Sequence, residues 1–277
     1  MCNAATKLIA TTALATMITA CSGNSGKIDP ATELYNQAEA QYQAGNPQQV
    51  YLLLDSIKSA YPDSVGLQRR GLMLRRQAFL IELADEIVLV DDSINQCIAD
   101  VNALKPLIKT INDPRLVEPY SVAAAGYNPD FLSTTGIQAR IDDAGQFYII
   151  SSLQSALKHT GIKLTASSES AEAGPVPFDG ELNYRINGSE VITFSPMQSQ
   201  AIGEFASSHR DQGATLQFTG GKSHSVKLNA KQVNAIADCY DYSKAMTRGR
   251  LLSLQREKLT RQQQLTTSQI DQLKSAN

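Results

Sequence analysis

Apolar residues recur every three or four positions in two short runs between residues 30 and 64. Asp29 and Pro30 are typical of a helix start, since an aspartate side chain can cap free N–H groups and proline is preset for the first turn. Gly45, Asn46 and Pro47 stop this helix and begin another. The pattern predicts a helical hairpin over residues 30–64.

This hairpin resembles one tetratricopeptide repeat, a family whose helix pairs form peptide-binding surfaces. The matching positions for large, small, turn and proline residues are Leu34, Ala38, Gly45, Val50, Leu54, Ile57 and Pro62. Val50 and Ile57 are larger than the alanine usual at those positions, so it is left open whether the helices pack as closely as in such a repeat. A generic helical hairpin is the alternative. Because stacked repeats need about three copies and one is found, we expect the hairpin to pack on the segment that follows.

A long helix is predicted over residues 65–112 as the first helix of a stalk. Its apolar residues alternate in steps of three and four, as in a coiled-coil seam: Leu80, Leu83, Ile87, Val90, Ile94, Cys97, Val101, Leu104, Ile108 and Ile111. Pro106 should kink or end this helix near Lys105, because proline lacks the N–H that an α-helix needs.

A second long helix is predicted over residues 229–277. Asn229 can cap it, with Gln232 three residues on, as in a capping box. Its apolar stripe is weaker, and Gln262, Gln263 and Gln264 make the last third polar. The similar lengths of the two helices favour an antiparallel coiled-coil stalk within one chain. A parallel homodimer, in which each seam pairs with its own copy, is the alternative.

The intervening residues 113–228 show short alternating runs separated by turn residues, which predicts an inserted, mostly antiparallel β domain. The expected strands are Leu116–Val122, Ile137–Ile141, Phe147–Leu153, Ile162–Ser167, Leu182–Ile186, Glu190–Phe194, Thr215–Thr219 and Ser225–Leu228. Asn187-Gly188 and Gly220-Gly221 suggest hairpin turns. A helix over Pro196–His209 should turn Met197, Ile202 and Phe205 inward, and Ser167–Pro177 reads as a flexible loop. The predicted fold class is α+β.

Residues 1–20 have the pattern of a secretory signal peptide, with one charge at Lys7 and an apolar stretch too short to span a bilayer. Ile18, Thr19, Ala20 and Cys21 resemble the lipobox of bacterial lipoproteins. The resemblance implies cleavage before Cys21, a lipid on that cysteine, such as palmitate, and a tether over residues 21–29. Ser22 after the cysteine, in place of Asp, implies the outer membrane by the sorting rule of many such lipoproteins, and we favour its periplasmic side.

The charge and the cysteine content of the chain bear on its possible partners and on its covalent bonds. The net charge is −2, from 25 Lys and Arg against 27 Asp and Glu, so nothing points to nucleic acid.

Exported proteins can hold disulfides. Cys97 lies near the end of the first stalk helix and Cys239 near the start of the second, so an antiparallel hairpin would bring them level. We therefore hypothesise a Cys97–Cys239 bridge, with two buried free thiols as the alternative.

The sequence offers no catalytic, cofactor or metal motif. His159, His209 and His224 lack metal-ligand spacing, and we expect them at the surface or in turns. Gly220-Gly221-Lys222-Ser223 and the pair Ser155 and Lys158 match fragments of catalytic motifs without their companions.

These features favour a lipid-anchored protein of the cell envelope that acts as a non-enzymatic scaffold or adaptor for another envelope protein. One alternative is a lipoprotein that binds a small molecule or glycan in its middle domain. A less favoured alternative is an enzyme of unfamiliar type. The oligomeric state is left open.

Overall fold

A computed structural model describes residues 28–113, 118–178, 180–186 and 188–275 of the chain. The chain divides into two compact units, with the boundary between Ala78 and Phe79. The α+β class predicted from the sequence is confirmed. The signal peptide, Cys21 and the tether up to residue 27 lie outside the described residues.

The first unit contains the predicted helical hairpin, made of α1 (Pro30–Gln43) and α2 (Pro47–Ala60). The Asp29 side chain caps α1 by accepting a hydrogen bond from the backbone N–H of Thr32. The hairpin packs on the first turns of α3 (Val65–Leu104), as expected for a hairpin that cannot bury its apolar face alone. Their shared core is Tyr35, Ala38, Val50, Leu54, Ile57, Leu74 and Ala78.

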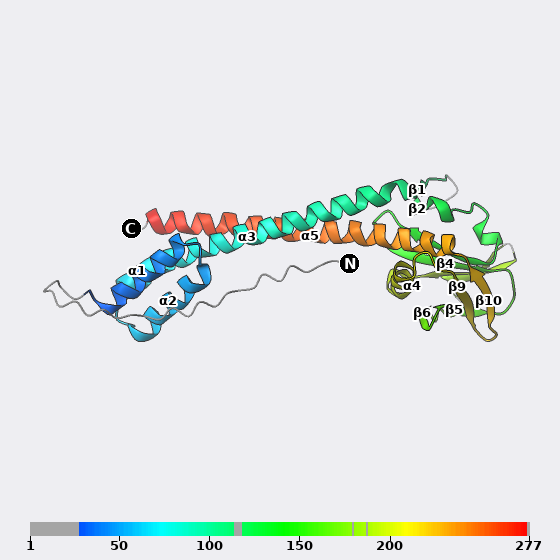
Figure 1. Ribbon diagram of the computed structural model, residues 1–277, viewed down its shortest axis with the longest axis horizontal. Helices are drawn as coiled ribbons and strands as arrows, with labels where there is room; N and C mark the ends of the chain where they lie inside the picture. Colours follow the sequence, from blue (N-terminus) through cyan, green and yellow to red (C-terminus); the bar gives the residue numbers. More distant parts are fainter. Residues whose placement is uncertain (1–27, 114–117, 179, 187, 276–277) are drawn as a thin grey trace. The chain divides into compact units, whose positions relative to one another are not determined.

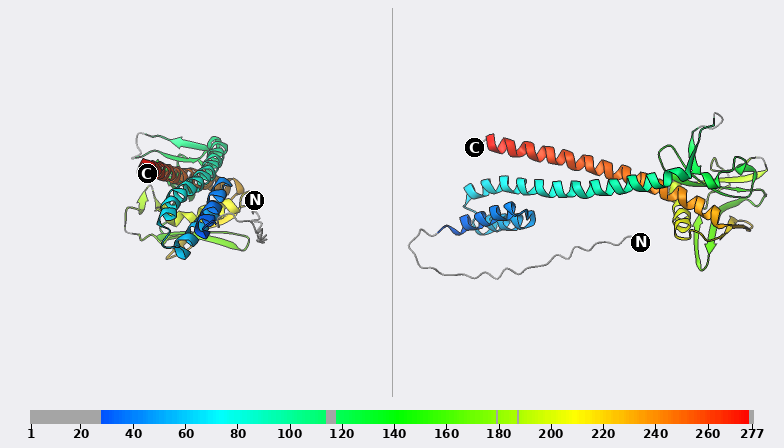
Figure 2. Two further views of the ribbon diagram at one scale, coloured as in Figure 1. Left: turned by 90° about the vertical axis from the view of Figure 1, so that its left-hand side faces the viewer. Right: turned by 45° about the horizontal axis from the view of Figure 1, so that its top comes forward.

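In the second unit, the rest of α3 runs beside α5 (Ala230–Ser275) to form the predicted antiparallel stalk (Figures 1 and 2). Leu83, Val90 and Leu259 are buried between the helices. Leu80, Ile87, Ile94 and Leu252 pack against them. The seam of α3 is therefore used within one chain, rather than against the seam of a second copy.

The first stalk helix is shorter than predicted. It ends at Leu104, and Pro106 lies in the 3-10 turn η1 (Lys105–Leu107). Ile108 and Ile111 continue the seam spacing but belong to strand β1 (Ile108–Ile111), which pairs with β2 (Tyr120–Ala123). The expected break near Lys105 is confirmed, and the β domain, called the head below, begins at Ile108 instead of residue 113.

The head contains two sheets in which every strand pair is antiparallel. The first has the order β1-β2-β3-β4-β8-β7, with β3 at Gly136–Ile141, β4 at Phe147–Leu153, β7 at Asn183–Ile186 and β8 at Ser189–Phe194. The second has the order β10-β9-β5-β6, with β5 at His159–Ala166, β6 at Glu169–Ala173, β9 at Ala214–Gly220 and β10 at His224–Leu228. Two 3-10 turns, η2 (Ala124–Gly126) and η3 (Phe131–Ser133), connect β2 to β3.

Most predicted strands are confirmed, but the predicted Ser167–Pro177 loop contains a strand. Its residues Glu169–Ala173 form β6, which pairs along its length with β5. As an edge strand, β6 buries Ala173 and half-buries Ala171, while Glu169, Ser170 and Glu172 are exposed. Its apolar alternation is limited to two alanines, which is a weak strand signal. Both predicted hairpins, β7–β8 and β9–β10, are present.

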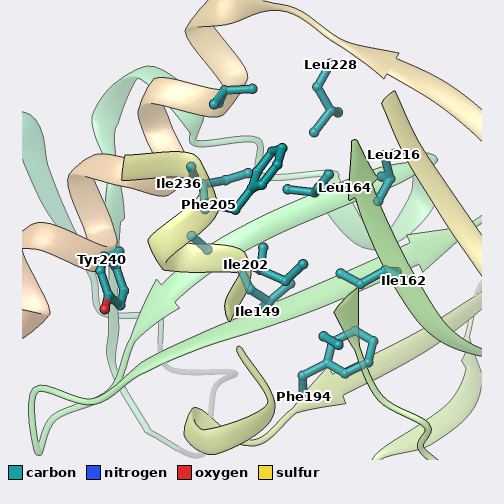
Figure 3. Packing of buried hydrophobic residues seen from close by; sticks show 14 of the residues in the cluster. Ile149, Ile162, Leu164, Phe194, Ile202, Phe205, Leu216, Leu228, Ile236 and Tyr240 are labelled. Atoms are coloured by element: carbon teal, nitrogen blue, oxygen red, sulfur yellow. The ribbon is translucent and has the colours of Figure 1, made fainter. Parts of the chain in front are cut away.

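Helix α4 (Pro196–Ser208) and the first turns of α5 pack on the sheets and complete the main core, which Figure 3 shows. Ile202 and Phe205 of α4 point inward as predicted, but Met197 is 86% exposed. Met197 lies two residues before the buried Ser199, which places it on the opposite side of the helix. Gly203 permits close packing, since a Cβ there would lie 2.2 Å from Cδ2 of Tyr240.

Candidate functional site

A chain of three polar side chains crosses the interior of the head. Ser151 lies on β4, His159 on β5 and Glu190 on β8, and all three are fully buried. The Ser151 Oγ lies 3.0 Å from His159 Nε2, and His159 Nδ1 lies 3.0 Å from an oxygen of Glu190. The chain thus links the six-stranded sheet to the four-stranded sheet.

The charge in this chain lies on Glu190. Burial acts to raise the pKa of Glu190, but hydrogen bonds from the His159 ring and from the backbone N–H groups of His159 and Lys158 outweigh it, so that the pKa is below its usual value. Burial lowers the pKa of His159, and the bond to Glu190 opposes this only in part. A neutral His159 therefore donates from Nδ1 to the carboxylate and accepts at Nε2 from the Ser151 hydroxyl.

This order of hydroxyl, imidazole and carboxylate matches the arrangement that activates a serine nucleophile in acyl transfer. A nucleophile also needs access to its substrate, and Ser151 and His159 expose no surface. Asn183 reinforces the closed arrangement by donating from Nδ2 to the carbonyl oxygens of His159 and Val176. In this structure the three side chains therefore join the two sheets through a buried carboxylate whose hydrogen bonds are satisfied.

A second site lies in the first unit, where an apolar groove of about 610 Å³ runs between α2 and the start of α3. Its floor includes the buried Leu54 and Ile57, while Val65 is 70% and Leu72 52% exposed at its edge. A Cβ on Gly71 would lie 3.1 Å from Leu54, so glycine permits close approach of the helices here. The rim carries Asp55, Lys58, Arg69 and Arg75. We call this the hairpin groove.

The hypothesis of a Cys97–Cys239 disulfide is wrong. Both cysteines are buried free thiols. Cys97 faces Gly249, where an added Cβ would lie 3.4 Å from that of Cys97. Gly249 is ten residues beyond Cys239, or about 15 Å along a helix. Cys239 instead lies in the head, where its sulfur accepts a hydrogen bond from the N–H of Ala123.

One of the three histidines is not where the sequence led us to expect it, since His159 is fully buried within β5. His209 lies in the turn after α4, with its ring stacked on Phe205, and His224 is exposed, both as predicted. Ser155 and Lys158 lie between β4 and β5, and Gly221–Ser223 form the turn between β9 and β10. The Lys158 backbone N–H donates to Glu190, so this fragment meets the buried polar side chains through its main chain.

The described part of the chain contains no group of three or more His, Cys, Asp or Glu side chains placed to hold a metal ion. Nor does any helix among these residues have an apolar stretch long enough to cross a membrane.

Comparisons with known proteins add no relative: no family model, no curated protein and no solved structure matches this chain.

Proposed function

We propose that this protein is a lipid-anchored, non-enzymatic adaptor of the cell envelope that binds another envelope protein. The observation that carries the proposal is the hairpin groove, which leaves large apolar side chains exposed beside a buried apolar floor. Exposed apolar patches of this kind commonly mark protein interaction sites. The anchor part of the proposal rests on the lipobox resemblance at Cys21, and places the protein at the outer membrane, facing the periplasm.

The groove favours a partner segment with apolar residues and acidic flanks. The rim holds three cations, Lys58, Arg69 and Arg75, against the single carboxylate of Asp55. Arg75 is already hydrogen-bonded to Asp55. Helix pairs that bind peptides typically take an amphipathic segment whose apolar side chains enter the groove. Charge at the rim would then select the orientation of that segment.

The groove is tested by placing a photo-crosslinking amino acid at Leu72 in the lipidated full chain in cells. The matched control is Leu52, a leucine of α2 that is 60% exposed and lies outside the groove. We expect one adduct of defined mass from position 72 and none from position 52, and we expect Lys58→Glu to weaken it. Equal adducts at both positions, or none at either, would contradict the adaptor function.

The anchor is tested separately with Cys21→Ala. We expect the unchanged chain to incorporate radiolabelled palmitate and to sediment with outer-membrane vesicles, and the variant to do neither. A variant that keeps its label and its membrane association would show that the lipid is not attached at Cys21.

The ligand-binding alternative has weaker support. In the head, the cavity lined by Val122, Phe131, Gln138 and Ile236 among others is about 110 Å³, whereas pockets for small ligands usually measure about 300–1,000 Å³.

The enzyme alternative draws on the hydrogen-bonded side chains of Ser151, His159 and Glu190, and a fluorophosphonate probe tests it. We expect Ser151 to remain unlabelled in the folded protein, because its hydroxyl is inaccessible.

A further inference from the structure

One face of the stalk is marked by a hydrogen bond between its two helices. Gln255 of α5 donates from Nε2 to Glu86 of α3, over 3.2 Å. Residues three, four or seven positions away on a helix lie on the same side. Leu89 and Glu82 therefore flank Glu86 on this face, and Leu251 and Lys258 flank Gln255. Arg248 lies seven residues before Gln255, Leu265 seven after Lys258 and Asp100 fourteen after Glu86, so they share this face. We call these residues the stalk face.

The stalk face exposes apolar side chains that the seam does not use. Leu89 is 67% exposed, Leu251 62% and Leu265 60%. A solvent-exposed helix normally places polar residues opposite its buried stripe. The two helices thus carry more apolar surface than a two-helix pair can bury.

The charges on the two helices are opposite. Between Phe79 and Leu104, α3 carries six acidic residues and no Lys or Arg. Between Arg248 and Arg261, α5 carries five basic residues and one acidic residue. The stalk face therefore has an acidic edge with Glu86 and Asp100, and a basic edge with Arg248 and Lys258.

We propose that two copies of this chain associate through the stalk face into an antiparallel four-helix bundle. A two-fold axis parallel to the stalk lays α3 of each copy on α5 of the other at the same level. Within one copy, Cys97 is level with Gly249. Between copies, the same register places Asp100 and Arg248 on facing helices with an offset along the stalk axis of about two residues, or roughly 3 Å. Glu86 and Lys258 have the same offset.

A second copy fits this face better than an unrelated partner, because the face complements itself. The acidic edge of each copy meets the basic edge of the other, so the same contact occurs twice in the dimer. The face is also large enough, since 26 residues of helix span about 39 Å and two helices are about 20 Å wide. The area of about 800 Å² per copy is typical of specific protein interfaces. This inference is independent of the hairpin groove and of the lipid anchor.

The test exchanges the charges on the two edges and follows the mass of the full chain by sedimentation velocity in density-matched detergent. The acidic-edge variant combines Glu86→Lys with Asp100→Arg, and the basic-edge variant combines Arg248→Asp with Lys258→Glu. We expect the unchanged chain to dimerise and each variant to have a dissociation constant at least about tenfold higher, since like charges then face each other.

The decisive sample is a mixture of the two variants, co-expressed with different affinity tags. In a mixed dimer every edge regains an opposite charge, so the tags should co-purify to the level of the unchanged chain. The matched control changes two exposed turn residues of the head, Asp143→Arg with Lys222→Asp, and should leave the dimer unaffected. Circular dichroism confirms that each variant is folded. A monomeric unchanged chain, or variants that dimerise normally, would overturn the proposal, as would a mixture that fails to pair.

Discussion

The head and the stalk of the second unit bury their side chains in different ways. In the head, two sheets and two helices enclose apolar side chains on several sides, including Phe194, Ile149 and Leu164 (Figure 3). In the stalk, one row of side chains is covered by the facing helix alone. Near the end of α5, a space of about 710 Å³ opens between Leu80 and polar residues such as Gln263 and Gln272.

The two kinds of packing suit different roles. A core with contacts on all sides holds one arrangement, because any movement opens a void. A single seam between two helices gives less burial per residue and leaves two faces for other helices. We therefore expect the head to resist local opening, and the stalk to open more readily and to gain stability from association.

The largest difference should appear when a charge is removed from each region. Glu190→Gln in the head should lower the free energy of unfolding by about 3–5 kcal/mol, because an amide nitrogen replaces one accepting oxygen and each buried donor left unsatisfied costs about 1–3 kcal/mol. Asp91→Asn in the stalk removes the partner of Arg256 in a pair whose side chains are 40% and 47% exposed. Its cost should be about 0–1 kcal/mol. Urea unfolding followed by circular dichroism measures both, and equal losses would show that the buried chain does not stabilise the head.

Leucine truncation compares the apolar packing of the two regions. Leu164→Ala in the head should cost about 4 kcal/mol, towards the upper end for such changes, because strands on both sides keep the cavity open. Leu259→Ala in the stalk should cost about 2 kcal/mol, since the two helices can close together over the space. The two residues are 0% and 4% exposed, so burial alone does not separate them. A larger loss from Leu259→Ala would contradict the view that the stalk is the looser region.

Acid should weaken the head through His159 and Glu190, whose pKa values both lie below their ordinary values. For each group the unfolded chain binds protons at a higher pH than the folded chain does. The stability that they contribute is thus present above the unfolded pKa values, which are about 6.5 and 4.3. It is lost as the pH falls from about 6.5 for His159 and from about 4.3 for Glu190.

Thermal melting between pH 7 and pH 4 measures this loss. His159→Gln should flatten the upper part of the pH profile, although the variant is less stable throughout. His224→Gln, at an exposed histidine, is the matched control and should leave the profile unchanged. A profile that His159→Gln does not alter would show that other groups carry the pH dependence.

Local patterns predicted the stalk and most of the sheet from the sequence. The three-and-four spacing from Leu80 to Leu104 was sufficient for α3, and Pro106 located its end. Spacing could not tell that Ile108 and Ile111 continue as a strand, since two apolar residues three apart suit either structure. Edge strand β6 was missed because its stability comes from pairing with β5 rather than from its own side chains.

The buried hydrogen bonds among three polar side chains could not be predicted from the sequence, for a different reason. Ser151, His159 and Glu190 lie on three strands, and only the pairing of those strands brings them together. Alternation along β5 gave no signal for His159, because a regular strand would place it on the face of Lys163, opposite Ile162. The register shift between His159 and Gly161 interrupts that alternation. The disulfide hypothesis failed on register: the two helices do pair, but Cys239 lies in the head, ten residues before the point that faces Cys97.

The smallest effect, and the most direct view of the two regions, is the reactivity of the two thiols. Cys97 is 3% exposed in the stalk and Cys239 is fully buried in the head. Burial raises the pKa of Cys239 to about 12, so this thiol is a weak nucleophile while the head is closed, because the thiolate is the reactive form. A maleimide should therefore modify Cys97 at least about tenfold faster than Cys239, through local opening of the helix pair. Peptide mass mapping over time gives both rates, and Cys97→Ser and Cys239→Ser assign them. If two stalks associate as proposed, the rate at Cys97 should fall as protein concentration rises, while the rate at Cys239 stays constant. Equal rates would mean that the stalk opens no more readily than the head.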